Sequence, residues 1–407
     1  MRAYERLLKY VKVDTPSDPH SETTPSSACQ FDLAKLLVEE LKELGVDNAH
    51  VDEKCYVYAS IPATEGYEKC KALGFIAHMD TAPDFNGKGV NPKVTPDYDG
   101  NDLVLGTSGY VLRAKDFPEL SNMKGRTLIT TDGTSLLGAD DKAGIAEIMT
   151  MVERILTENI PHGKICVGFT PDEEIGAGAD HFDVEKFGAD IAYTLDGGME
   201  GEIEYENFNA AGADFVIHGN NVHPGSAKNI MVNAQLLAME INGMLPADET
   251  PATTEGYEGF FHLTDMEGTV EKAKLEYIIR DHDREKFEAR KALVEKITSD
   301  MNEKYGAGTV ELNVKDQYYN MKEMIEPHME LIEYAKEAAK AVGINPKVVA
   351  IRGGTDGARL SFMGLPCPNL GTGGFGFHGP YEHITAEGMD LCVEMALKIV
   401  EKYSEEK

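Results

Sequence analysis

Basic residues are scarce in this sequence. Its 407 residues include 39 Lys and Arg against 70 Asp and Glu, which gives a formal net charge of −31. A chain with this charge repels nucleic acid and anionic membrane surfaces, so we expect neither as a partner. Most of the acidic side chains are expected to lie on an ordinary solvated surface.

Paired cysteines and long apolar segments are absent as well. The six cysteines include no C-x-x-C pair, which argues against a thiolate zinc site and against a disulfide framework. No segment approaches the length of a transmembrane helix, and residues 1–17 carry charges throughout, without the apolar centre of a signal peptide. We therefore expect reduced cysteines and a cytoplasmic location.

What the sequence does contain is an alternation of strand and helix patterns, in a chain longer than one hydrophobic core usually organises. Leucines at helical spacing predict a helix over residues 30–44, and a second helical pattern covers 142–156. Short apolar runs predict strands at 57–61, 73–77, 127–130, 165–169 and 191–195. This alternation indicates an α/β sheet covered by helices.

The pattern changes between about residues 211 and 320. The predicted elements there are, in order, a strand at 214–218, a helix at 231–244, strands at 259–264 and 274–280, a helix at 284–304 and a strand at 309–316. This β-α-β-β-α-β order is that of a ferredoxin-like α+β unit. The α/β pattern resumes afterwards, so we expect one domain formed by 1–210 and 321–407, with a second domain, 211–320, inserted into it.

Polar side chains follow four of the predicted strands at the points where these strands end. They are His78 and Asp80, Asp140 and Asp141, Glu173 and Glu174, and Asp196. Because ligands bind at the carboxyl ends of the strands in an open α/β sheet, we expect these side chains to converge on one crevice. Clustered carboxylates need a cation, and imidazole with several carboxylates suits two zinc-like ions that share one carboxylate. Such a pair activates water and polarises a carbonyl, as amide hydrolysis requires.

The acidic run "TPDEEIGAGA", residues 170–179, offers two roles side by side. Glu174 can ligate a metal while Glu173 faces the water as general base, and Asp80 can hold the second ring nitrogen of His78. Taken alone, a histidine at a strand end is more often structural, and two adjacent acids are usually a solvated turn. The hypothesis therefore depends on the combination of these motifs.

The run Gly371–Gly376 fits the pattern G-x-G-x-x-G. A dinucleotide-binding fingerprint leads directly into a helix, whereas this run continues as Phe-His-Gly-Pro over 377–380, which argues against a nucleotide site. We interpret it as a flexible loop that delivers His378 to the metals. His383, in the same region, is the alternative ligand.

These motifs resemble those of a known family. His-Met-Asp (78–80), Gly-Ala-Asp-Asp-Lys-Ala-Gly (138–144), Pro-Asp-Glu-Glu-Ile-Gly (171–176), Leu-Asp-Gly (195–197) and Phe-His-Gly (377–379) are similar to motifs of the dinuclear zinc peptidases that include aminoacylase and glutamate carboxypeptidase. The likeness covers essentially the whole chain. It implies a zinc-peptidase catalytic domain, with a mixed sheet flanked by helices, and an inserted ferredoxin-like lid domain.

The resemblance also implies a role for individual residues. It assigns the ligands of two Zn²⁺ ions, for which Co²⁺ or Mn²⁺ can substitute: Asp140 between the ions, His78 and Asp196 on one, and Glu174 and His378 on the other. Glu173 would be the general base and Asp80 the orienting acid.

Three residues would bind the substrate. The resemblance implies that His223 contacts the carbonyl or oxyanion, from its own or from a partner subunit. Arg280 and Arg352 match positions suited to grip a substrate carboxylate, because a guanidinium presents a fork to it; a structural ion pair is an equal alternative for both. The inserted domain invites edge-strand pairing between two copies of the chain, so a homodimer through it is a further hypothesis.

The expected activity is hydrolysis of short peptides. The resemblance is strongest to family members that release the N-terminal residue of tripeptides by attack of a metal-bound hydroxide. A dipeptidase or an N-acyl-amino-acid hydrolase is the alternative, and it differs only in substrate length and end group. A non-catalytic binding protein would lack a ligand or the base, and none is missing. An RNA-binding role for the inserted domain conflicts with the acidic composition.

Overall fold

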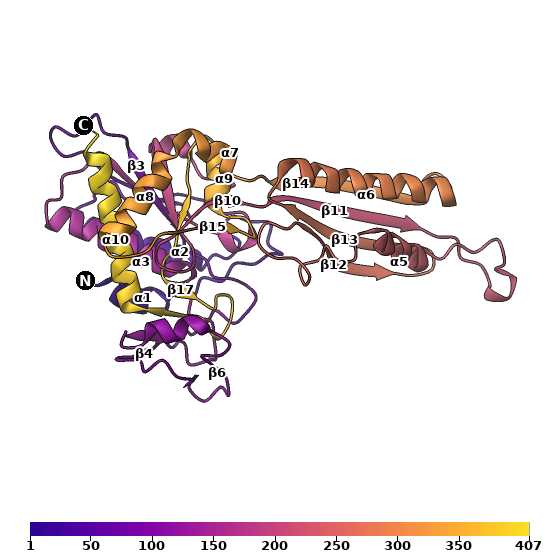
Figure 1. Cartoon of the computed structure of the whole chain (residues 1–407), viewed down its shortest axis with the longest axis horizontal. Coiled ribbons are helices and arrows are strands. Elements are labelled where there is room, and N and C mark those ends of the chain that lie inside the picture. Colours follow the sequence, from indigo (N-terminus) through magenta and orange to yellow (C-terminus); the bar gives the residue numbers. More distant parts are fainter. Residues whose placement is uncertain (407) are drawn as a thin grey trace. The chain divides into compact units, whose positions relative to one another are not determined.

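The computed structural model describes residues 1–406, which form two compact units. Unit 1 comprises Met1–Tyr205, Glu323–Val349 and the described chain from Thr355 onward, and unit 2 comprises Glu206–Lys322 and Ala350–Gly354. Figure 1 shows the elements of both units, coloured by their position along the chain. Within residues 1–406 no helix is both long enough and apolar enough to cross a membrane.

Unit 1 is built on a mixed sheet with the strand order β1-β2-β8-β3-β9-β16-β10-β15. The strands are β1 (His50–Val51), β2 (Val57–Ile61), β3 (Leu73–His78), β8 (Ile165–Thr170), β9 (Ile191–Leu195), β10 (Glu202–Asn207), β15 (Lys347–Ile351) and β16 (Asn369–Leu370). β8, β3, β9 and β16 are parallel, and β2 is antiparallel to β8. Every residue of β3, β8 and β9 is buried, which explains why they read as unbroken apolar runs.

Helices cover this sheet. They are α1 (Ala3–Tyr10), α2 (Gln30–Glu43), α3 (Ala139–Thr157), α4 (Val184–Phe187), α7 (Lys322–Ile325), α8 (Glu330–Ala341), α9 (Asp356–Phe362) and α10 (Ala386–Ser404). α3 packs against β3 and β9 and contacts α1 and α10, while α4 and α9 pack against β8 and β9. A Cβ on Gly74 would lie 2.6 Å from the Phe187 ring, so this glycine in β3 permits the close approach of α4. The predicted α/β class is confirmed.

A second, antiparallel sheet in unit 1 was not predicted. Its order is β17 (Gly374–Phe375), β18 (His383–Thr385), β7 (Leu128–Thr130) and β4 (Lys93–Thr95), and a separate ribbon joins β5 (Leu103–Val104) to β6 (Val111–Leu112). The expectation that β7 ends at the edge of the same open sheet as β3, β8 and β9 is therefore wrong. β7 pairs instead with β4 and β18, which are three residues long and too short to produce a periodic pattern.

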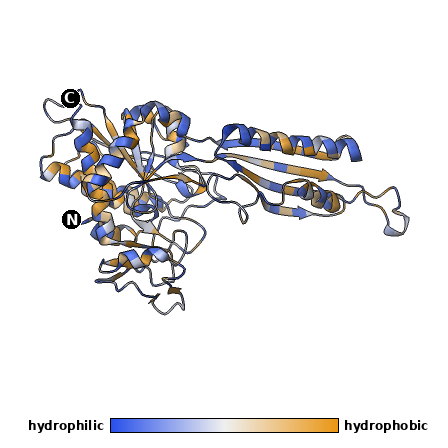
Figure 2. Cartoon of the chain, in the orientation of Figure 1, coloured by the Kyte–Doolittle hydropathy of each residue, from blue (hydrophilic) through white to orange (hydrophobic). Residues whose placement is uncertain are grey.

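Unit 2 has the predicted order of elements. They are β11 (Asn209–His218), α5 (Ala234–Met244), β12 (Phe260–Gly268), β13 (Lys272–Asp281), α6 (Arg284–Tyr305) and β14 (Val310–Tyr318), in an antiparallel sheet of order β12-β13-β11-β14. α5 begins three residues later than predicted, because the Asn233 side chain caps it by accepting from the Gln235 N–H. Figure 2 shows hydrophilic residues along most of α6, interrupted by hydrophobic ones; the buried ones are Phe287, Val294, Ile297 and Met301.

Candidate active site

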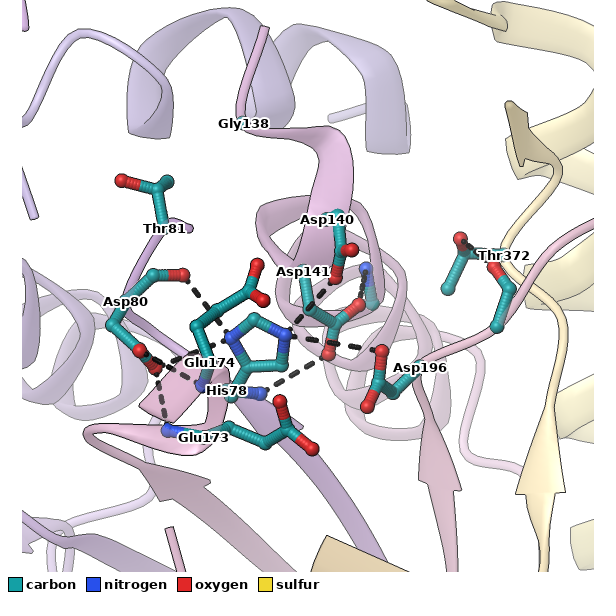
Figure 3. Close-up of polar contacts among 12 residues, drawn as sticks. His78, Asp80, Thr81, Gly138, Asp140, Asp141, Glu173, Glu174, Asp196 and Thr372 are labelled. Carbon is teal, nitrogen blue, oxygen red and sulfur yellow. Dashed lines mark hydrogen bonds and ion pairs between the residues drawn. The ribbon is translucent and has the colours of Figure 1, made fainter. Parts of the chain in front are cut away.

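Three strand ends and one helix start bring four of the predicted ligands, His78, Asp140, Glu174 and Asp196, together (Figure 3). β3 ends at His78, Asp196 follows β9, and Glu173 and Glu174 lie in a short turn after β8. Asp140 is at the start of α3, where its backbone departs from helical geometry (φ −83°, ψ 104°). The crevice is thus formed as expected at the carboxyl ends of parallel strands, with the α3 terminus in place of a fourth strand.

The carboxylate of Asp140 lies between two imidazoles. Its Oδ1 is 3.0 Å from His78 Nε2, and its Oδ2 is 3.3 Å from His378 Nε2. Asp196 Oδ1 lies 3.8 Å from His78 Nε2, and Glu174 Oε2 lies 3.0 Å from His378 Nε2. One oxygen of Asp140 therefore faces each of the two predicted ligand groups.

These side chains fit a divalent cation. In the part of the chain that the structure describes, their ion pairs are with histidine and none is with lysine or arginine. Glu174 Oε1 is buried without a hydrogen-bond partner among residues 1–406, so an acceptor there is left for a positively charged group. Buried imidazole and carboxylate donors are ligands that zinc and related metals take.

The pKa shifts in the cluster also favour the binding of a cation. Burial raises the pKa of Asp196 well above its ordinary value, and it also raises the pKa of Glu174, in which the Asp140 carboxylate acts in the same direction. Hydrogen bonds to Asp140 and Glu174 raise the pKa of His378 to about 11. The carboxylates thus hold protons on the imidazoles, and bound cations would take the place of these protons.

Asp80 orients His78 and the turn that carries Glu173 and Glu174. His78 Nδ1 lies 3.1 Å from the Asp80 backbone oxygen and 3.3 Å from its carboxylate Oδ1. The same carboxylate, fully buried, accepts hydrogen bonds from the backbone N–H groups of Glu173 (3.0 Å) and Glu174 (3.1 Å). Asp80 therefore fixes both the ring of His78 and the turn that carries the two glutamates.

Glu173 projects toward the same crevice without pairing with a histidine (Figure 3). It shares the lining of a small cavity with Thr170, Asp196 and Asp356. Burial raises the pKa of Glu173 well above its ordinary value, and the Asp196 carboxylate raises it further. A carboxyl group with a raised pKa is suited to take up and release a proton near neutral pH.

The structure separates the two alternative histidines. His378 lies in the loop between β17 and β18 with φ +61°, and its ring reaches Asp140 and Glu174. His383 begins β18 and is fully buried, with Nδ1 donating to the Tyr381 carbonyl (2.7 Å) and Nε2 3.7 Å from Glu119. Of the two, only His378 is at the carboxylate cluster.

The predicted substrate-binding arginines lie in unit 2 and make no ion pair with a carboxylate of residues 1–406. Arg352 donates to the carbonyls of Gly256 (2.7 Å) and Glu258 (2.9 Å). Its guanidinium carbon is 5.1 Å from the centroid of the Phe208 ring. The structural ion pair considered as an alternative for Arg352 is thus not formed.

Arg280 and His223 are placed differently. Arg280, on β13, donates to the carbonyls of Ala211 (3.3 Å) and Ile279 (3.0 Å) and lies over the Tyr318 ring. Burial lowers the pKa of Arg280. His223 is exposed, and its Nδ1 accepts a hydrogen bond from the Gly225 N–H at 3.1 Å.

Sequence reasoning missed three buried acids around the ligands. Asp172 accepts hydrogen bonds from the Ser26 N–H and the Gln30 side chain, both at 2.7 Å. Asp356 accepts from the Thr170 hydroxyl at 2.8 Å, and burial raises the pKa of Asp356 to about 6. Asp172 is the first acid of the run that contains Glu173 and Glu174, and this position was the available signal.

The third missed acid is Glu382. Its carboxylate accepts the backbone N–H groups of Leu137, Gly138 and Asp140, and burial raises the pKa of Glu382 to about 7. Its place four residues after His378 in the sequence was a weak indication, because nothing in the spacing identifies the backbone groups it binds.

Comparison with known proteins gives consistent results. A family model described as "Peptidase dimerisation domain" matches residues 205–309. The chain is 57% identical to Peptidase T of Alkaliphilus oremlandii over 98% of each chain, and 58% identical to Peptidase T of Clostridium perfringens (strain 13 / Type A) over 99% of each.

Solved structures share the fold at lower identity. Aminopeptidase PepT from Bacillus cereus superposes with a TM-score of 0.77 at 24% identity, covering 99% of this chain and 98% of that one. A tripeptidase from Staphylococcus aureus gives 0.80 at 23%, with the same coverage. The Bacillus subtilis YXEP protein, described as a dinuclear metal binding peptidase from the M20 family, gives 0.66 at 16%, again over 99% and 98%.

Proposed function

The chain belongs to the peptidase T family, and from this premise we propose that it is a metal-dependent aminopeptidase that releases the N-terminal residue of tripeptides. The observation that carries the proposal is the carboxylate of Asp140, which turns one oxygen toward His78 and the other toward His378. An arrangement with one shared carboxylate and two separate ligand groups is that of a dinuclear hydrolase site.

We assign Zn²⁺ to both positions, with Co²⁺ or Mn²⁺ as substitutes. His78 and Asp196 would hold one ion, Glu174 and His378 the other, and Asp140 both. The distances among these side chains and the unpartnered Glu174 Oε1 support this assignment. When bound, such ions activate a water molecule and polarise the carbonyl of the scissile bond.

The chain's own residues carry the proton. Glu173, with its raised pKa, would accept a proton from the attacking water on its carboxylate and pass it to the departing amine. Asp80 holds His78 in one ring orientation and anchors the backbone of Glu173 and Glu174. The base and one ligand of each ion are thereby positioned by a single buried carboxylate.

Recognition of the substrate is assigned to unit 2. Arg280 and Arg352 would bind the peptide carboxylate, which is supported by the absence of an acidic partner for either among residues 1–406. His223 would contact the carbonyl or oxyanion, from its own or a partner subunit. In domain terms, 1–210 and 321–407 form the catalytic domain, and 211–320 forms the inserted lid domain.

We further propose a homodimer formed through the inserted domain. The family model that matches residues 205–309 is named for dimerisation. β12 is an edge strand, and α5 exposes Leu236 and Met239, which are 61% and 62% accessible. An unpaired strand edge beside exposed apolar side chains is a surface that a second copy can cover. The cytoplasmic location stays a prediction.

The test is turnover of a matched set of substrates with and without a chelator. The set contains a dipeptide, a tripeptide, a tetrapeptide, an N-acetylated tripeptide and an N-acyl amino acid. We expect release of the first residue from the free-amine tripeptide, abolished by the chelator and restored by Zn²⁺. Preferred cleavage of the dipeptide or of the N-acylated compounds would replace the substrate assignment with the dipeptidase or N-acyl-amino-acid hydrolase alternative.

A further inference from the structure

Glu382 and the proposed ligand His378 lie in the same short loop. The loop spans residues 376–382 between β17 and β18, and these strands pair through Phe375 and His383. β18 in turn pairs with β7, with His383 opposite Thr130. The chain that leaves β7 runs through residues 131–138 to the start of α3 and to Asp140. Two neighbouring strands of one small sheet therefore lead to two different ligands.

The start of α3 lacks the usual local cap. Gly138 is the N-cap residue, adopts a left-handed conformation (φ +77°) and has no side chain with which to accept a hydrogen bond. The first N–H groups of a helix have no partner within the helix and must be satisfied from outside. Here the partner comes from a distant part of the sequence.

Glu382 supplies a partner for Asp140 near the start of the helix and also binds two N–H groups of the segment that leads into it. Oε2 accepts the N–H groups of Leu137 (2.7 Å) and Gly138 (2.8 Å), and Oε1 accepts the N–H of Asp140 (2.9 Å). The side chain is 1% exposed, so water does not compete for these donors. Hydrogen bonds from backbone N–H groups to a carboxylate are stronger than those between neutral groups.

We propose that Glu382 is a positioning residue that fixes the backbone of Asp140 relative to His378, and so sets the geometry of the ion that both side chains bind. The inference rests on the proposed dinuclear site. Glu382 contacts neither substrate nor ion in this assignment. It acts through Asp140, which its Oε1 holds directly, and through the loop that it shares with His378.

Loss of Glu382 should affect the two ions differently. His78 ends β3 and Asp196 follows β9, and we expect these strands of the large sheet to keep their place without Glu382. Glu174 is held by Asp80, but His378 and Asp140 depend on the loops that Glu382 joins. Loss of Glu382 should therefore weaken the ion between Asp140, Glu174 and His378 more than the ion at His78 and Asp196.

The experiment compares Glu382→Gln and Glu382→Ala with a matched control, Glu147→Gln. Glu147 is a fully buried glutamate on the same helix, α3, whose two oxygens have no hydrogen-bond partner among residues 1–406. Burial raises its pKa well above the ordinary value, so glutamine closely resembles its protonated form. The full chain is stripped of metal and titrated with Zn²⁺ by calorimetry and with Co²⁺ by absorption spectroscopy.

We expect Glu382→Ala to lower the affinity for one of the two ions by roughly 10- to 100-fold, as the loss of a supporting contact behind a metal ligand typically does. Glu382→Gln keeps one acceptor oxygen and should fall between Glu382→Ala and the wild type. The absorption spectrum should change for the Co²⁺ ion between Asp140, Glu174 and His378. Glu147→Gln should bind both ions as the wild type does.

The inference is overturned if both Glu382 variants bind two ions with wild-type affinity, or if Glu147→Gln weakens binding equally, which would indicate a general packing effect. Failure of the proposed function would look different. In that case the wild-type chain would bind both ions without cleaving peptides, or would bind none at all before any variant is compared.

Discussion

The two units of this protein differ in the sign of the charge that lacks a partner among lysine, arginine and carboxylate side chains. In unit 1, the carboxylates of Asp140, Glu174 and Asp196 face each other and two imidazoles, with no lysine or arginine paired to them in the described chain. In unit 2, Arg280 and Arg352 donate to backbone carbonyls and lie over aromatic rings, with no carboxylate paired to either among residues 1–406. A charge that is even partly removed from water is costly when no opposite charge faces it. Unit 1 is therefore suited to bind cations, and unit 2 is suited to bind an anionic group.

The largest effect is expected from removing the cations. Chelation should abolish turnover and lower the melting temperature, because a ligand that binds only the folded state stabilises it. The loss of stability should grow with pH. Burial raises the pKa of Asp356 to about 6 and that of Glu382 to about 7, and a group with a raised folded pKa loses its stabilising contribution as the pH rises through that value.

Two further groups of the site do not oppose this trend. The pKa of Asp140 is lowered by its histidine partners, so its contribution is lost only as the pH falls below the ordinary value of an aspartate. The pKa of His378 is raised to about 11, so its stabilising contribution also declines as the pH rises above the ordinary value of a histidine, in the same direction as for Asp356 and Glu382. The measurement is thermal unfolding at pH 4.5, 6 and 7.5 with chelator and with Zn²⁺. A difference between the two conditions that stays constant or shrinks with pH would contradict the cluster of cation-dependent acids.

The next largest effect is expected at Glu173. Glu173→Gln removes the group that takes up the proton but none of the proposed ligands, so kcat should fall by roughly 10²- to 10⁴-fold, the usual contribution of a general base. Bound metal, measured by elemental analysis, should stay at the wild-type level. Glu147→Gln is the control for a buried glutamate changed to its amide. A variant with near-normal turnover would remove Glu173 from the mechanism.

A smaller effect is expected when an arginine side chain of unit 2 is replaced. Arg280→Met should lower kcat/KM for tripeptides by about 10- to 100-fold, since a hydrogen bond to a charged group contributes about 1.5 to 3 kcal/mol. Tripeptide amides, which lack the carboxylate, should lose no further activity in the variant. Arg284→Met, at a half-exposed arginine of α6 paired with Glu288, is the matched control. Equal losses for acid and amide substrates would show that Arg280 supports the fold of unit 2 instead.

Some features of unit 1 could be predicted from the sequence and others could not. Polar residues at strand ends pointed to His78 and the carboxylates of unit 1, because the end of an apolar run places a side chain at the edge of a sheet. His378 was predicted from its glycine-rich loop and its Phe-His-Gly context instead. Strands β2 and β9 have the predicted bounds, since β9 is buried at every residue and β2 at every residue but Ser60, which leaves mostly apolar runs. The sheet that contains β7 was missed because its pairing partners are short and distant in the sequence.

The supporting contacts could not be predicted for a related reason. Glu382 binds backbone N–H groups more than 240 residues away, and Asp172 binds Ser26 and Gln30 across more than 140. A backbone donor has no residue type, and neither pair leaves a periodic pattern. Candidate ligands can therefore be predicted from local sequence, whereas their placement depends on long-range hydrogen bonds that only the folded chain shows.

The smallest effect is expected when a buried carboxylate loses one of its two hydrogen-bonding partners and keeps the other. Gln30→Met keeps the shape of the side chain but removes its hydrogen bond to the buried Asp172 carboxylate, which still accepts from the backbone and hydroxyl of Ser26. The cost should be about 1 to 3 kcal/mol of unfolding free energy, measured by urea denaturation. Because Glu173 and Glu174 stay anchored by Asp80, kcat should change less than tenfold. Gln317→Met, at an exposed glutamine of β14, should cost less than about 0.5 kcal/mol. Equal stability of the two variants would mean that Ser26 alone holds Asp172, and a large loss of turnover in Gln30→Met would mean that Asp80 does not suffice to hold the glutamates that follow it.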